Sequence, residues 1–145
     1  FDGEVNNSAW GGTGTNPATS LTISSDAKEL VPSLWILQQN ITLDSVQYII
    51  ASDAASTVNI HIMSYDIVAG AGSTAGDLTN GAVIGQTGSS AGSLSAVTSG
   101  ADRISSGTLT INTADIGSGK AIVLFAEASD TDDMTLQVNI KYHLR

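Results

Sequence analysis

The chain has 145 residues, close to the commonest size of a single domain, and it carries a formal net charge of −9 with only five Lys and Arg. So few cations disfavour binding to nucleic acid, whose phosphates must be neutralised, and disfavour a polybasic contact with a membrane. The absence of Cys excludes a disulfide framework and a Cys-based metal site, and no apolar run approaches the roughly 18 residues of a membrane span.

The first twenty residues are predicted to form an irregular arm. Gly and Asn recur there without any apolar period, and Phe1 and Trp10 are its large apolar side chains. Two interpretations stay open: Trp10 pins the arm to its own domain, which we favour, or the arm reaches a neighbouring subunit. Because the chain begins with Phe1 rather than Met, we expect processing or an origin in a longer polypeptide. The expected organisation is an arm over residues 1–20 and a single β-sandwich domain over residues 21–145.

Several short strands are expected in the first half of that domain. Residues 21–24 and 33–37 are brief runs, separated by a single helical turn that Pro32 stops. Residues 41–50 alternate between apolar and polar and then become apolar on both sides, as in a central strand. Residues 58–65 alternate clearly, and the polar turn before them predicts a hairpin.

The middle of the chain is predicted to be rich in loops. The longest loop is expected over residues 69–81, because it contains four Gly and ends on Asn80-Gly81, a strong turn signal. Short strands are expected at residues 82–87 and 104–111, with a weak edge strand at residues 94–98.

The final hairpin is the clearest feature of the sequence. Residues 121–126 form a nearly unbroken apolar run, residues 129–133 form a polar turn, and residues 134–142 alternate between apolar and polar. Period two predicts a half-buried strand, since successive Cβ atoms point to opposite faces of a sheet. With eight or nine expected strands and no long helix, the pattern is typical of an all-β, antiparallel β-sandwich or a closed barrel.

No motif in the sequence names a chemistry, so we predict no catalytic, cofactor-binding or metal-binding residue and no enzymatic activity. Asp130, Asp132 and Asp133 offer oxygens to Ca²⁺, but the Gly and Glu that an EF-hand loop requires are missing. Clustered Asp residues are also ordinary turn chemistry. The glycines between residues 70 and 76 have the wrong spacing for a dinucleotide loop and lack the Lys of a P-loop.

The two histidines, His61 and His143, both occupy polar positions of alternating strands, and we interpret them as surface or interface imidazoles. A hydrolase would need them to meet carboxylates in one cleft. The aromatic residues offer a second alternative, a sugar-stacking platform in a carbohydrate-binding or adhesin module. Apolar neighbours predict core positions for three of them, whereas Tyr65 is expected to be exposed. The five aromatic residues considered are Trp10, Trp35, Tyr48, Tyr65 and Tyr142.

Three stretches of strands and small polar loops carry a family resemblance: residues 40–62, 109–124 and 135–142. In their spacing the chain resembles the jelly-roll-type β-sandwich domains of tailed-phage virion proteins, which occur in tail fibres, spikes and head-decoration proteins. The likeness covers roughly the last hundred residues and does not include the arm. It implies a jelly-roll-like sandwich and carries no catalytic or binding residue with it.

The resemblance implies a non-enzymatic structural protein of a virus particle. We expect a bacteriophage tail-fibre or appendage component that assembles as a homo-oligomer, commonly a homotrimer, with capsid decoration as the alternative. The expected partners are copies of the chain, other virion proteins and a host-surface glycan, without nucleic acid or membrane insertion. The expected location is the virion, an extracellular particle. A polar surface with only 13% charged residues suits packing against such copies.

Overall fold

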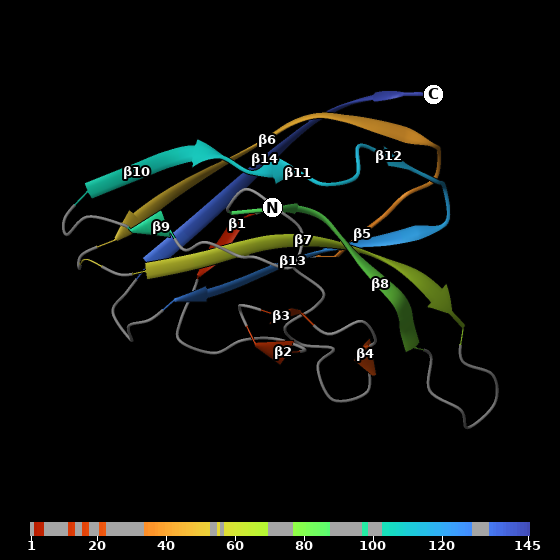
Figure 1. The fold of residues 1–145 in the computed structure, drawn as a ribbon, viewed down its shortest axis with the longest axis horizontal. Coiled ribbons are helices and arrows are strands. Elements are labelled where there is room, and N and C mark those ends of the chain that lie inside the picture. The colour runs from red at the N-terminus through yellow and green to blue at the C-terminus, as the bar shows by residue number, and fades with distance from the viewer. Residues whose placement is uncertain are drawn as a thin grey trace.

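The computed structural model describes residues 2–4, 12–13, 16–17, 21–22, 34–52, 55, 57–69, 77–87, 97–98, 103–128 and 134–145. Every regular element in these ranges is a β-strand (Figure 1). Across the same ranges, no helix has the length and apolar character that crossing a membrane requires. The prediction of an all-β fold is confirmed.

The strands follow one another as β1 (Asp2–Glu4), β2 (Gly12–Thr13), β3 (Asn16–Pro17), β4 (Leu21–Thr22), β5 (Leu34–Ile36), β6 (Ile41–Ser52), β7 (Thr57–Val68), β8 (Asp77–Gln86), β9 (Val97–Thr98), β10 (Arg103–Thr108), β11 (Thr110–Ile111), β12 (Asp115–Ile116), β13 (Lys120–Ala128) and β14 (Met134–Leu144). The described chain is divided more finely than the expected eight or nine strands, because eight segments contain only two or three residues.

Two antiparallel sheets pack against each other. The first has the strand order β1-β14-β6-β10, with β12 also paired to β6. The second has the order β11-β8-β7-β13-β5, with β4 paired to β8 and β9 paired to β7. A separate ribbon joins β2 and β3. In the view of Figure 1, β10, β6 and β14 run together above β7 and β13.

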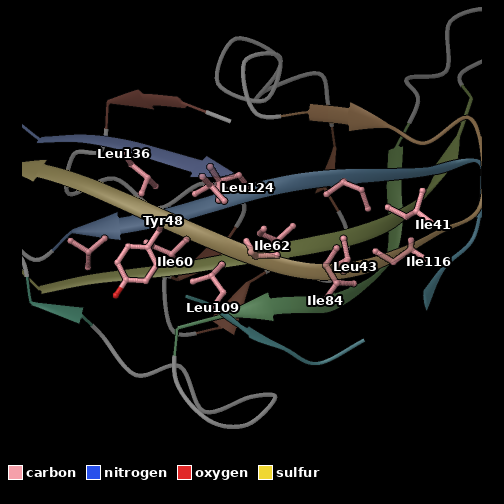
Figure 2. Packing of buried hydrophobic residues seen from close by; sticks show 14 of the residues in the cluster. Ile41, Leu43, Tyr48, Ile60, Ile62, Ile84, Leu109, Ile116, Leu124 and Leu136 are labelled. Carbon is pink, nitrogen blue, oxygen red and sulfur yellow. The ribbon is translucent and has the colours of Figure 1, made fainter. Parts of the chain in front are cut away.

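The main core fills the space between the two sheets, as Figure 2 shows. Strands β6 and β14 of the first sheet supply alternate side chains to it, and β7, β8 and β13 supply them from the second. Period-two alternation therefore predicts the buried positions of β14 correctly: Leu136 is 3% exposed and Val138 is 1% exposed. Burying one such side chain contributes about 1.5–3 kcal/mol.

The second sheet is apolar on both of its faces. Residues Val58, Ile60 and Ile62 of β7 join the core between the sheets. On the opposite face of β7, Met63 and Tyr65 join a second buried cluster together with Leu78, Ala121, Val123 and Phe125. The alternation predicted for residues 58–65 is thus correct about the faces, but both of those faces are buried.

One strand run closes a long side of the sandwich. Within residues 103–116, β10 pairs with β6 of the first sheet, β11 pairs with β8 of the second sheet, and β12 pairs with β6 again. Between these pieces, Leu109 N–H donates to the Val46 carbonyl at 2.9 Å, and Asn112 N–H donates to the Ile84 carbonyl at 2.9 Å. These bonds tie the two sheets together at this edge.

The loop predicted over residues 69–81 is shorter than expected, because β8 already begins at Asp77. Asn80 has a φ of 51°, a left-handed conformation that Asn tolerates better than most residues. The register of β7 against β8 shifts between Ser64 and Asp66. Asn80-Gly81 therefore forms a bulge inside a strand, where a terminal turn was predicted, and Asn80 Nδ2 donates to Asp66 Oδ2 at 2.8 Å.

Part of the predicted arm is a strand. Residues of β1 pair with β14, with Asp2 opposite Gln137 and Glu4 opposite Thr135. The expectation that residues 1–20 are irregular throughout is wrong, because the edge of β14 offers backbone partners that the local sequence does not reveal. Trp10, the helical turn expected before Pro32 and the polar turn at residues 129–133 lie outside the described residues.

Candidate functional site

A pocket of about 240 Å³ opens between β5 and β14, on the side of the sandwich away from β10 and β11. Strand β5 is the edge of the second sheet here, and the C-terminal part of β14 lies beyond its pairing with β1; at this side no described strand bridges from one sheet to the other. The pocket is lined by Trp35, Ile36, Leu37, Gln38, Gln39, Ile41, Tyr142 and Leu144. None of these residues carries a formal charge, although the chain as a whole is strongly acidic.

Two aromatic rings meet across this opening. The centroids of Trp35 and Tyr142 lie 5.2 Å apart, and the ring planes are tilted by 49°. Tyr142 pairs with Leu43 and so belongs to the inner face of its sheet. It is nevertheless 44% exposed, so the predicted core position of Tyr142 is wrong. The reason is that β5, the facing edge strand, is only three residues long and leaves the ring partly uncovered.

The segment that carries Gln38 and Gln39 is held on both sides by backbone hydrogen bonds. Leu37 N–H donates to the Lys120 carbonyl, and the Leu37 carbonyl accepts from Gly119 N–H, both at 2.9 Å. Asn40 Oδ1 accepts from Ser118 N–H at 2.8 Å. The Asn40 carbonyl accepts from Arg145 N–H at 3.0 Å. The pocket wall is therefore preorganised.

Charged groups gather on strands β6, β12 and β14 near the same end. His143 Nδ1 lies 2.9 Å from Asp44 Oδ1. An Arg145 guanidinium nitrogen lies 3.1 Å from Asp115 Oδ2, and Thr42 donates its hydroxyl to Asp115 Oδ1 at 2.6 Å. These pairs are exposed, so each contributes little to stability, about 0–1 kcal/mol. Their main effect is to fix the C-terminal end of β14 beside the pocket.

No group of three or more His, Cys, Asp or Glu side chains suited to a metal ion exists among the described residues. The cluster of Asp130, Asp132 and Asp133, which the sequence offers as Ca²⁺ ligands, lies outside those residues.

The structure corrects the interpretation of His61 as a surface or interface imidazole. His61 is 1% exposed, and its ring stacks on Phe125 with centroids 5.2 Å apart and planes 16° from parallel. Neither ring nitrogen has a hydrogen-bond partner among the described residues. Burial lowers the pKa of His61 to about 4, because the charged form loses its hydration.

Sequence reasoning missed this burial because it assumed that one face of β7 meets water. His61 pairs with Phe125 on one side and Gln86 on the other, in the middle of the second sheet. Only His143 of the two histidines contacts a described carboxylate, and it belongs to the other sheet. The structure does not bring the two imidazoles together as the hydrolase hypothesis requires.

The predictions for the other described aromatic residues have different outcomes. Tyr48 is 8% exposed in the main core, as predicted, and Trp35 is half-buried at the pocket. Tyr65, which was expected to be exposed and available for a sugar, is 0% exposed and meets Phe125 edge-on at 6.4 Å. Burial raises the pKa of Tyr65, because the phenolate would be desolvated.

A second surface feature is the outer face of β14, β6 and β10, here called the uncharged face. Cross-strand pairs place its side chains in rows, because residues directly opposite each other point to the same side. Its members are exposed or half-exposed: Gln47, Ile49, Ala51, Ile104, Ser106, Thr108, Thr135, Gln137 and Asn139. Ile104 is 75% exposed and Ile49 is 37% exposed. These nine residues carry no charge in a chain of net charge −9, and the neighbouring strand β1 borders them with two acidic register positions, Asp2 opposite Gln137 and Glu4 opposite Thr135.

A comparison with protein-family models finds no match, and a search of curated proteins finds no significant match.

Proposed function

We propose that this protein is a non-enzymatic structural component of a virus particle, and that it assembles as a homo-oligomer, commonly a homotrimer. Within that class, a bacteriophage tail-fibre or appendage component is preferred, and capsid decoration is the alternative. The proposal includes a jelly-roll-type strand connection, a location in the extracellular virion, and other virion proteins as partners. It rests on the sequence resemblance to tailed-phage sandwich domains and on the uncharged face.

The uncharged face is the observation that carries the assembly proposal. Copies of a chain with net charge −9 repel each other wherever their carboxylates approach. On this face the polar groups are hydroxyls and amides, beside two isoleucines, and the carboxylates Asp2 and Glu4 belong to the bordering strand β1, so two copies that meet over β6 and β10 bring fewer like charges together than they would elsewhere. Amides and hydroxyls both donate and accept hydrogen bonds, while Ile49 and Ile104 supply apolar area.

Strand edges give a second reason for assembly. Strand β10 is an edge of the first sheet, and β5 is an edge of the second. Exposed edges carry unpaired backbone groups that invite pairing with another chain, and a cyclic oligomer covers them. Virion proteins work in large symmetric assemblies, where such edges are buried between neighbours.

The mass of the full chain in solution tests this proposal. Sedimentation analysis is expected to show an oligomer that strengthens with added salt, because salt screens repulsion between acidic copies. Ile49→Glu and Ile104→Glu place carboxylates on the uncharged face and are expected to weaken association by about tenfold or more. Ala82→Glu adds the same charge at an exposed position of the other sheet and serves as the matched control.

A monomer at all salt concentrations would overturn the assembly proposal. If all three variants weaken the oligomer equally, the effect comes from the added net charge, and the uncharged face is not the interface. Electron microscopy of particles that co-purify with the chain tests the virion assignment, and a cell extract in which the chain copurifies with no particle would count against it.

A further inference from the structure

We infer that the pocket between β5 and β14 binds one ring of a neutral saccharide. The pocket lies on the side of the sandwich away from β10 and β11, and it is formed inside a single copy of the chain. This inference goes beyond the proposed assembly and does not depend on it.

The lining selects an uncharged ligand. A phosphate or carboxylate ligand would need an Arg, a Lys or a set of N–H donors, and a cationic ligand would need a carboxylate. The pocket residues include neither acids nor bases. The neighbouring cations Lys120 and Arg145 are already paired, with Asp66 and Asp115 respectively.

The lining also selects a ligand with an apolar face and a hydroxylated rim. The rings of Trp35 and Tyr142 offer apolar surface on which the C–H face of a pyranose can lie. Gln38 and Gln39 line the pocket and are exposed, and each amide both donates and accepts. Sugar hydroxyls also donate and accept, so an amide satisfies them in either orientation.

The size of the pocket limits the ligand to one ring. Its volume of about 240 Å³ is below the 300–1,000 Å³ typical of pockets that hold drug-sized molecules. A longer glycan would place a single residue in the pocket and leave the remainder in solvent. The hydrogen bonds that hold Leu37 and Asn40 keep the wall in place, which lowers the entropy lost on binding.

One shallow site with few polar contacts binds weakly, and a dissociation constant on the order of 1 mM is expected. If the chain assembles, several identical pockets on one particle raise the effective affinity for a surface that displays many copies of the sugar. Weak single-site binding is thus compatible with firm attachment.

The experiment is a heteronuclear NMR titration of the full chain with glucose, galactose, mannose and N-acetylglucosamine. Sialic acid serves as an anionic probe and cyclohexane-methanol as an apolar ring. We expect at least one neutral sugar to shift the Trp35 indole N–H and the side-chain amides of Gln38 and Gln39. Sialic acid and the apolar ring are expected to bind about tenfold more weakly than that sugar.

Matched variants locate the site. Tyr142→Ala and the double variant Gln38→Ala with Gln39→Ala are expected to weaken binding by about tenfold, whereas Tyr142→Phe keeps the ring and binds within about twofold of the unaltered chain. Ile104→Ala, at the exposed far edge, is expected to bind normally. All of these positions are exposed, and the NMR spectrum itself reports whether each variant is folded.

The inference is overturned if no neutral sugar shifts the pocket resonances, or if the apolar ring binds as tightly as the best sugar. It is also overturned if Tyr142→Ala binds normally. None of these outcomes changes the mass in solution, so failure of the saccharide site and failure of the assembly proposal are separate results.

Discussion

Protonation of His61 should make the protein markedly less stable in mild acid. In the folded state the imidazole is buried against Phe125 and its pKa is lowered to about 4, while in the unfolded chain it returns to 6.5. Between these two pH values the unfolded chain binds a proton that the folded chain does not. Folding stability contributed by the neutral ring is therefore fully present above pH 6.5 and falls as the pH drops through this window.

The size of the effect follows from the separation of the two pKa values. Each pKa unit corresponds to about 1.4 kcal/mol, so the loss between neutral pH and pH 4 is about 3 kcal/mol for this single group. That is a large fraction of the roughly 5–15 kcal/mol that stabilises a typical domain. Below pH 4 the contribution of His61 levels off, because both states are then protonated.

Urea unfolding at several pH values between 4 and 8 measures this loss. His61→Leu removes the titrating group and both unpartnered nitrogens, so its stability should depend much less on pH across the same window. His143→Gln changes the exposed histidine and serves as the control, which should keep the steep dependence of the unaltered chain. All carboxylates are retained in the three proteins, and His61→Leu leaves the contact between His143 and Asp44 intact, so the difference between the unaltered chain and His61→Leu isolates His61. Parallel profiles for the unaltered chain and His61→Leu would refute the reasoning.

Two further predictions concern local geometry. Gly107→Ala should destabilise the protein by about 1–3 kcal/mol in urea unfolding, because a Cβ there would lie 2.5 Å from the Tyr48 hydroxyl oxygen. Gly85→Ala is the control. Its Cβ would meet its nearest neighbour at 3.7 Å, so it should lower the free energy of unfolding clearly less. Equal losses for the two variants would contradict this. Lys120→Met should raise the pKa of Asp66 toward 3.8, because the hydrogen bond from Lys120 is the main cause that lowers it. An NMR titration of Asp66 that leaves its pKa unchanged would exclude that cause.

Local stereochemistry was enough to predict the strand character of the chain and the inner face of its clearest strand. Side chains two apart on β14 point the same way whatever surrounds them, so the alternation from residue 134 to 142 predicts that Leu136 and Val138 are buried. The same local stereochemistry predicts strand β7 correctly, but both predicted hairpins are wrong. Strand β6 pairs with β14 while β7 pairs with β8 and β13 in the other sheet, and β13 and β14 likewise belong to different sheets. Periodicity is a property of a single strand.

What covers each face was decided only by the tertiary structure. His61 and Tyr65 occupy the second face of β7, and nothing in their own neighbourhood shows that this face is buried with Phe125. Tyr142 has the pattern of a core residue, but it is exposed because the facing edge strand is short. The candidate site depends on the same information. The pocket and the uncharged face arise from strand order and register, which are set by contacts between residues far apart in the chain.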